Sequence, residues 1–356
     1  MNSTIKYVGM DVHDATISIA VRNTQGKLVM ESTVATHAAS ILDFIHGLSG
    51  TVHVAFEEGA QSAWLYDLLF PHVAKVVVCD SRKTDLLKAG NKNDRVDGRK
   101  LSELLRGGLL SAVYHGENSL RILKEVVRSY STLTEDTTRI MARLKAIFRG
   151  RAIACAGRRI YSPRQREQWL AKLSPPGLKF RAQQLYEELE AVQPLRRTAR
   201  RAMLTEMRKF EVAQRLRTIT PMGPIRVATF MARVQAPYRF RTKKQLWGYC
   251  GLGLETRVSA EYRVVKGQVE RARKPVLIRG LNLNHNHDLK NVFKGAALTA
   301  STHPGPLYDF YQRLLAQGAE PAMARLTLAR KIAAIALAIW KKGGTFDPKY
   351  LTQSAA

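Results

Sequence analysis

The chain has 356 residues and carries 57 Lys and Arg against 29 Asp and Glu, a formal net charge of +28 at pH 7. This length has room for two domains with separate cores, and the positive excess favours a polyanionic partner such as nucleic acid. The sequence shows neither an apolar run long enough to span a membrane nor a basic and then apolar leader. We therefore expect a cytoplasmic protein that does not contact a membrane.

The beginning of the chain reverses this charge balance. Residues 1–60 hold 3 Lys and Arg against 6 Asp and Glu. A phosphate backbone approaches an acidic surface closely when divalent cations bridge the two, and Mg²⁺ is the usual bridging ion. The contrast with the basic remainder predicts metal-assisted phosphodiester chemistry in the N-terminal part.

Hydrophobic periodicity predicts an α/β domain over residues 1–115. The expected elements, in chain order, are strands at 7–12, 16–21 and 28–34, a helix at 38–48, a strand at 52–56, a helix through 64–69, a strand at 75–79 and a helix at 94–106. The turn residues Asn23 to Gly26 separate the second strand from the third. Three meandering strands followed by strands with helical crossovers are typical of the ribonuclease-H-like (RuvC-like) fold.

We expect that topology to bring four acidic residues close together. Asp11 lies on the central first strand, Glu57 ends the fourth strand, and Asp94 and Asp97 are one helical turn apart. Carboxylates from three elements can then converge on one or two Mg²⁺ ions. Glu58 competes with Glu57 for one of these places, because strand alternation sends only one of the two side chains inward.

A basic helical region is predicted over residues 116–217. Long coiled-coil-like helices are expected at 119–148 and 181–216, with Val192 and Leu195 among the apolar positions of the second, and a turn at 174–177 with irregular residues 150–170 between them. Residues 139–217 contain 20 Lys and Arg against 6 Asp and Glu, which predicts phosphate contact rather than a merely solvated face. The candidate contact residues are Arg158, Arg159, Arg196, Arg197, Arg200 and Arg201.

The C-terminal region, residues 218–356, is predicted to be mainly helical, with its last long helix at 323–342. The segment from Thr220 to Ile225 is similar to a helix-hairpin-helix turn, in which Gly223 would offer backbone N–H groups to a phosphate; a plain tight turn is the alternative. A basic hairpin-like stretch follows, with Arg257 and Lys266 as candidate phosphate contacts. It includes Ser259, which stands among arginines that could hold a phosphate.

Five segments of the chain carry a resemblance to a known family: Tyr7–Val12, Ala55–Gly59, Lys92–Asp97, Thr218–Pro224 and Gln245–Leu252. In order and spacing they resemble the DEDD transposases of bacterial insertion sequences related to the Piv and MooV invertases. The resemblance implies a recombinase of the bacterial cytoplasm and nucleoid that cuts and rejoins donor and target DNA. It also implies that Asp11, Glu57, Asp94 and Asp97 form the Mg²⁺-dependent quartet.

The resemblance further implies partners and a nucleophile. Members of the family look like recombinases guided by a structured bridge RNA, and they use a serine of the C-terminal domain as nucleophile; Ser259 occupies that place here. The acidic site of one protomer would meet the serine of another, so a dimer or tetramer is expected. The sequence departs from the family's serine pair followed by glycines, because Val258 precedes Ser259 and Ala260 follows it.

The same residues are compatible with other activities. A junction-resolving nuclease, or a nucleic-acid-binding protein without a covalent serine step, remains the alternative. His285 and His287 with Tyr308 or Tyr311 resemble single-strand nucleases with a histidine pair, but those enzymes need an apolar residue where Asn286 stands. No histidine in this region is followed at the third position by arginine, which excludes a tyrosine recombinase.

Overall fold

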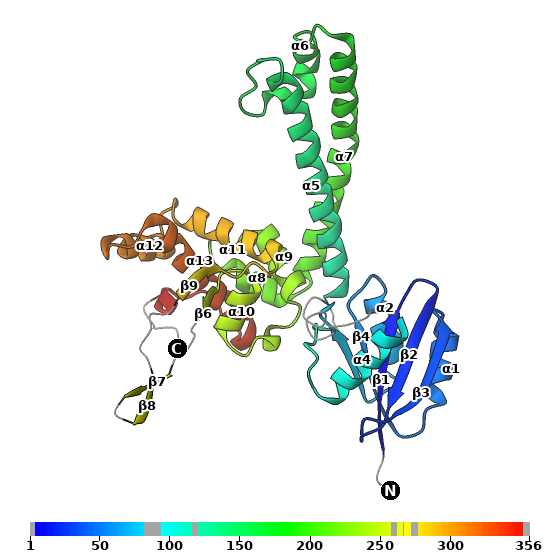
Figure 1. Ribbon diagram of the computed structural model, residues 1–356. Helices are drawn as coiled ribbons and strands as arrows, with labels where there is room; N and C mark the ends of the chain where they lie inside the picture. The colour runs from blue at the N-terminus through cyan, green and yellow to red at the C-terminus, as the bar shows by residue number, and fades with distance from the viewer. Residues whose placement is uncertain are drawn as a thin grey trace. The chain divides into compact units, whose positions relative to one another are not determined.

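The computed structural model describes residues 4–81, 94–115, 120–257, 262–265, 267–271 and 277–351, with the backbone alone at 94–95, 255–257, 262–265, 271 and 277–279. The chain divides into two compact units, Met1–Glu117 and Asn118–Ala356 (Figure 1). Within these described ranges, no helix is both long and apolar enough to cross a membrane.

The first unit is built on a five-stranded sheet in the order β3-β2-β1-β4-β5. The first three strands are antiparallel neighbours, and β4 and β5 extend the sheet in parallel from β1. The elements are β1 Ile5–Val12, β2 Thr16–Arg22, β3 Leu28–Ala35, α1 Ala38–His46, β4 Thr51–Glu57, α2 Ser62–Leu69, β5 Lys75–Cys79 and α4 Asp94–Arg106. The predicted α/β order is therefore confirmed, and each expected element lies within two residues of its observed bounds.

Strand alternation gives this sheet two different faces. On one face the apolar residues of the strands pack against α1 and α2, and the largest members of that core are Met10, Ile17, Ile41, Phe56, Leu65 and Leu69. On the other face Ala55 and Val77 pack against Leu105 of α4. Glu57 follows Ala55 at an interval of two, so it belongs to the face that α4 covers.

Helix α4 lies directly on the backbone of β1 because two glycines meet there. A Cβ atom at Gly9 would stand 2.2 Å from the carbonyl oxygen of Gly98 and 2.4 Å from the amide nitrogen of Ser102. The helix is also held from the side, since Arg99 donates from Nε and Nη2 to the Glu31 carboxylate of β3 at 2.6 Å each. The glycine contact therefore sets the height of α4 above the sheet.

The second unit begins with a long helical hairpin, α5 Arg121–Arg149 and α7 Pro176–Arg208, with η1 Arg159–Tyr161, η2 Pro163–Gln165 and α6 Arg166–Leu170 between them. The two long helices were predicted, but three bounds were wrong. Pro176 starts α7 instead of belonging to a turn, because proline is well suited to a first helical position. The expected helix 181–216 breaks at Phe210, whose backbone is extended, and continues as α8 Glu211–Arg217. Residues 150–170 also contain short helices.

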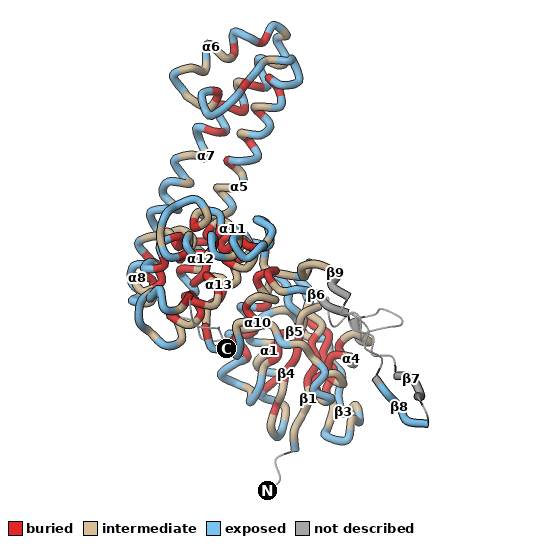
Figure 2. The backbone as a smooth tube through the Cα atoms, turned by 90° about the vertical axis from the view of Figure 1, so that its left-hand side faces the viewer, coloured by how far each residue is buried: buried red, intermediate tan, exposed pale blue. Residues whose placement is uncertain are grey.

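The hairpin has two separate cores. At its base, Leu123, Val127, Met203 and Met207 join the core of the C-terminal helices. At its tip a second core forms, with Ile140, Leu144, Phe148, Leu185, Tyr186 and Leu189 among its members. Between them, none of residues 128–136 of α5 and 190–202 of α7 is buried (Figure 2). We call this stretch the waist.

The predicted apolar face of α7 is wrong at the waist. Leu195 is 57% exposed, whereas Val192 is half-buried and packs against the core of the tip as the pattern predicts. Pro194 stands inside the helix, where it removes the hydrogen bond to the carbonyl of residue 190 and crowds that carbonyl. Weak packing and a missing backbone hydrogen bond therefore coincide in the waist.

The remainder of the second unit is mainly helical, as predicted. Its helices are α9 Pro224–Val234, η3 Pro237–Arg239, α10 Lys243–Tyr249, α11 His287–Ala300, α12 Pro306–Ala316, α13 Pro321–Lys342 and η4 Pro348–Leu351. Strand β6 Leu254–Arg257 pairs with β9 Leu277–Leu281, and β7 Tyr262–Val265 pairs with β8 Gln268–Arg271 as the expected hairpin. Arg330 of α13 donates from Nε to the carbonyl oxygen of Leu252 at 2.6 Å, which ties α13 to the chain that leads into β6.

We expect Gly9→Ala to destabilise the first unit strongly. The added methyl group meets backbone atoms of α4, which cannot rotate away as a side chain could, and overpacking of this kind costs about 1–3 kcal/mol or more. The measurement is the free energy of unfolding in urea. Gly59→Ala is the matched control, because a Cβ there has no neighbour within 4 Å; equal losses for the two variants would contradict the glycine contact.

Hydrogen exchange should reveal the waist. We expect the amides of residues 195–202 to exchange faster than those of residues 182–189, because local opening is easier where apolar contacts are few. Pro194→Ala should slow exchange around the waist, since it restores a backbone hydrogen bond. Uniform protection along α7, unchanged by this substitution, would rule out a locally weak segment.

Candidate active site and nucleic-acid interface

Asp11 and Glu57 are neighbours at one edge of the sheet. Strands β1 and β4 are parallel with Gly9 opposite Ala55 and Met10 opposite Phe56, so the next pair in register is Asp11 and Glu57. Both residues are half-buried, and the Asp11 side chain is 19% exposed. Two carboxylates thus stand side by side where the parallel strands end.

The direction of α4 brings a third acidic residue toward this edge. Near its C-terminus, Leu105 packs in the cluster that Tyr7 of early β1 also contacts, whereas Gly98 lies against Gly9 further along β1. Helix α4 therefore runs antiparallel to β1, and its N-terminal turn points toward the strand end that carries Asp11. Asp97 is half-buried in that turn. Asp94 begins the helix, and its side chain lies outside the described atoms.

The two consecutive glutamates after β4 differ in environment. Glu57 belongs to the α4 face and is half-buried, whereas Glu58 is exposed and its backbone N–H donates to the carbonyl oxygen of Cys79 at 2.9 Å. This geometry favours Glu57 as the site residue, which stays a prediction.

Three further polar residues, absent from the sequence-based prediction, surround the acidic pair. His13 Nε2 lies 3.2 Å from Asp11 Oδ2. Asp14 and Gln61 line a cavity of about 70 Å³ together with Glu57. Their location in the sequence could have indicated these residues. His13 and Asp14 directly follow the strand of Asp11, and Gln61 closely follows Glu57. Such residues can orient a carboxylate that holds a metal ion.

The donor set at this edge suits a hard divalent cation. Among the side chains that the structure describes, no three His, Cys, Asp or Glu lie close enough together to hold a metal ion, so the described acids do not form a closed cage. Mg²⁺ usually binds one or two carboxylates together with water and substrate phosphates. The Asp11 and Glu57 pair fits that requirement.

The candidate phosphate-binding arginines of the hairpin differ from Arg139 and Arg166 in their ion pairs. Arg139 pairs with Glu135 and Asp136, and Arg166 pairs with Glu190. In the described part of the chain, no ion pair is found for Arg158, Arg159, Arg196, Arg197, Arg200 or Arg201, and all but the half-buried Arg196 are exposed. Exposed guanidinium groups without a carboxylate partner are suited to bind phosphates.

The proline and glycine turn lies between α8 and α9, as predicted. Gly223 is the N-cap residue of α9 and Pro224 its first helical residue. Arg226 donates from Nη1 to the carbonyl oxygen of Pro221 at 2.7 Å, and burial lowers the pKa of this guanidinium. Arg226 thus holds the turn from the protein side, while the helix N-terminus offers N–H groups to an anion.

The structure leaves the proposed nucleophile unplaced, since Ser259 and Lys266 lie outside the described residues. Arg257 ends β6 opposite Leu277, with its side chain likewise not described.

The histidine pair lies at the N-terminus of α11. Asn286 caps α11 by accepting from the Leu289 N–H at 3.0 Å, and the rings of His285 and His287 are 4.4 Å apart between centroids. His285 Nδ1 is 2.6 Å from the carbonyl oxygen of Asn282. The two histidines stand at a helix start rather than on a strand, which disfavours the single-strand nuclease interpretation.

Two family models match this chain. The DEDD model of the IS110 type, described as a transposase, matches residues 8–151, and a model described as transposase IS116/IS110/IS902 family matches residues 213–312. The chain belongs to the IS110 family of DEDD transposases. The transposase is therefore a DNA strand-transferring enzyme of an insertion sequence. No curated protein matches it.

The two matched segments divide the candidate residues of the transposase. The first contains the acidic edge and α4, and the second contains the turn at Gly223 and the strands around Ser259. The six arginines of the hairpin fall between the two segments. The matched segments therefore say nothing about these arginines. Their exposure and their missing ion pairs are what favour a role in phosphate binding.

Reversal of Arg196, Arg197, Arg200 and Arg201 to Glu should weaken nucleic-acid binding for all sequences alike. Each lost phosphate contact should flatten the slope of log K against log salt by about 0.9 on duplex DNA, because fewer counterions are released. The measurement is a salt titration of binding. Arg139→Glu, beside Arg197→Glu, is the single-residue control, because Arg139 is already paired with acids; an unaltered slope in the fourfold variant would make these arginines a solvated face.

Proposed function

We propose that the transposase cuts and rejoins DNA strands with a Mg²⁺-dependent acidic site and a serine nucleophile, guided by a bridge RNA. The acidic site consists of Asp11, Glu57, Asp94 and Asp97, and the nucleophile is Ser259. The observation that carries the proposal is the parallel register of β1 and β4, in which Asp11 and Glu57 are neighbours. The antiparallel course of α4, which begins at Asp94, adds support.

The acidic residues would act on the phosphate through the cation they hold. Bound Mg²⁺ would supply Lewis acidity at phosphate oxygens and favour ionisation of an attacking hydroxyl group. Asp11 and Glu57 would bind it from the sheet edge, and Asp97 and Asp94 from the first turn of α4. His13, beside the Asp11 carboxylate, would fix the orientation of that ligand.

Ser259 would conserve the energy of the phosphodiester bond. Its oxygen forms a bond to phosphorus while one bond from phosphorus to a deoxyribose oxygen breaks, and the serine proton is transferred away as the leaving oxygen is protonated. The number of ester bonds is unchanged, so the strand can be rejoined to another end. The acidic site of one subunit would serve Ser259 of another, within a dimer or tetramer.

The bridge RNA would provide sequence recognition of donor and target DNA. Base pairing then selects the sequence, and the protein binds phosphates without reading bases, as in other RNA-guided systems. Residues 139–217 contain 20 Lys and Arg against 6 Asp and Glu, and this positive charge supports a role in binding phosphates. We further propose a division into a RuvC-like catalytic domain at 1–115, a basic helical region at 116–217 and a transposase domain at 218–356, in a protein of the bacterial cytoplasm and nucleoid.

A junction-resolving nuclease without a covalent serine step is the second candidate, because the acidic pair alone suits hydrolysis. Ser259→Ala distinguishes the two. A recombinase loses strand exchange and any covalent protein–DNA adduct in this variant, whereas a hydrolytic nuclease keeps cutting.

We expect Glu57→Gln to lower the rate of strand exchange by at least about 100-fold, because the amide removes a charged oxygen ligand of Mg²⁺. The measurement is the yield of recombined DNA with purified protein, guide RNA and Mg²⁺. Glu58→Gln is the matched control and should stay within a few-fold of the unaltered protein, since Glu58 is exposed. The opposite ranking of these two variants would refute the assignment of the acidic site.

A further inference from the structure

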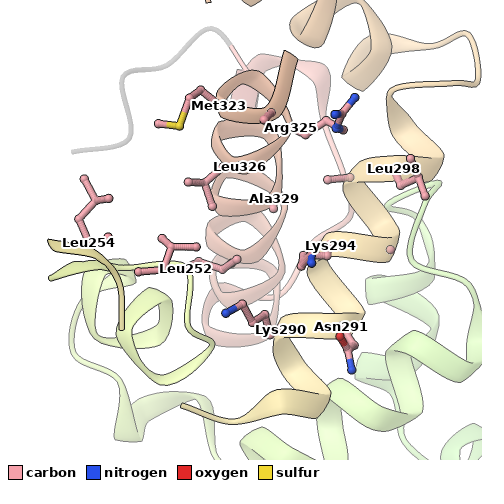
Figure 3. Close-up of a pocket in the computed structure, with 15 residues that line it drawn as sticks. Leu252, Leu254, Lys290, Asn291, Lys294, Leu298, Met323, Arg325, Leu326 and Ala329 are labelled. Carbon is pink, nitrogen blue, oxygen red and sulfur yellow. The ribbon is translucent and has the colours of Figure 1, made fainter. Parts of the chain in front are cut away.

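The second unit contains an apolar groove between α11, α13 and the paired strands β6 and β9 (Figure 3). Its volume is about 890 Å³. The aliphatic residues that line it are Leu252, Leu254, Leu281, Ala297, Leu298, Ala322, Met323, Leu326 and Ala329. A cavity of this size holds several side chains of a partner.

The rim of the groove leaves large apolar side chains open to solvent. Leu298 is 58% exposed, Met323 49% and Leu254 43%. Single exposed apolar residues are ordinary, but a contiguous set around a cavity marks an interaction surface. Flexible methionine at such a rim is common where an amphipathic helix is bound.

The charge of the groove selects the kind of partner. Among the side chains that the structure describes, the charged residues lining the groove are Lys290 and Lys294, one turn apart on α11, and Arg325 of α13, and none is an Asp or Glu. Across the described ranges, no ion pair is found for these three cations. The groove therefore suits an amphipathic helix that carries an acidic residue beside its apolar side chains.

The chemistry of the floor favours protein over nucleic acid. Single-stranded nucleic acids bind by stacking their bases on aromatic side chains. No aromatic residue is found among the described residues that line this groove, and aliphatic side chains instead pack well against the aromatic anchors of a protein partner.

The first unit presents a surface of the complementary kind on α2. Trp64 is 42% exposed, and Phe70, the C-cap residue of α2, is 49% exposed. The exposed Asp67 lies between them at three-residue spacing, so neighbouring members of the three lie on the same side of the helix. Residues 4–81 hold 4 Lys and Arg against 8 Asp and Glu, which makes this part acidic in a basic chain. We call Trp64, Asp67 and Phe70 the α2 face.

We propose that the α2 face of a second copy of this chain binds in the groove. The rings of Trp64 and Phe70 pack on the aliphatic floor, and the Asp67 carboxylate meets Lys290 and Lys294. The inference rests on the proposed function in one respect: strand exchange between two DNA duplexes requires more than one copy. The contact would bring the acidic edge of one subunit to the transposase part of another.

Disulfide trapping tests this contact on the full chain. The native cysteines Cys79, Cys155 and Cys250 are buried, so an introduced surface thiol is the reactive one. Ala63→Cys, beside the α2 face, is placed in one protein and Leu298→Cys, at the groove, in a differently sized version. Mixed and oxidised without DNA, RNA or metal, the two should form a covalent heterodimer, which is between copies by construction.

In the matched control, Val29→Cys takes the place of Ala63→Cys. Val29 belongs to the same unit and is 44% exposed. The control pair should trap at least about tenfold more slowly, because its thiols meet only by collision. Equal rates for the two pairs would overturn the proposal. So would a disulfide that forms only when Ala63→Cys and Leu298→Cys are in the same chain.

A charge exchange gives a second, independent readout. Lys290→Glu with Lys294→Glu in the groove protein should slow trapping by about tenfold, because like charges then face each other. Asp67→Lys in the other protein should restore the rate. Loss without restoration, or loss of nucleic-acid binding with trapping unchanged, would overturn the contact. Since trapping needs no catalysis, Ser259→Ala should leave it intact, and a failed activity test would not affect this result.

Discussion

The contact between Gly9 of β1 and Gly98 of α4 is the constraint on which the first unit depends. With a Cβ at Gly9 only 2.2 Å from a carbonyl oxygen of α4, a larger residue would lift the helix off the sheet. The helix also carries Asp97 in its first turn, and its height and direction decide how near that carboxylate comes to Asp11. Two residues without functional groups thus set the position of the helix that carries Asp97.

Charge is distributed unevenly over the chain. Carboxylates are concentrated at the sheet edge, and arginines are concentrated in the hairpin. The arginines of the hairpin are of two kinds, those that form an ion pair with an acidic residue and those that do not. Arg139 and Arg166 are paired with nearby acids, so they are less available to a polyanion than unpaired arginines. The exposed arginines around residue 200 have no such partners among the described residues, and a polyanion would neutralise them.

The local pattern of apolar and polar residues was sufficient to predict the helices and strands of the first unit. It was insufficient to predict features that depend on packing between segments far apart in the sequence. Alternation in β1 and β4 predicted both strands, and the shared edge of parallel strands predicted that Asp11 and Glu57 would approach. Leu195 continues a helical apolar pattern, yet it is exposed, because the opposing stretch of α5 is largely polar. Likewise, the groove joins β6 and β9 to α11 and α13, a juxtaposition that no single segment of sequence encodes.

The waist acts as a spacer of adjustable length. Because the tip and the base of the hairpin have separate cores, residues could be added to or removed from the intervening helices without disturbing either. Each added residue advances the tip by about 1.5 Å and turns it by about 100°. Seven residues added to both helices would lengthen the hairpin by about 10 Å and rotate its tip about the helix axis by only about 20°. Two added residues would lengthen it slightly and rotate the tip nearly to the opposite side. Selection could therefore change the length of the hairpin alone.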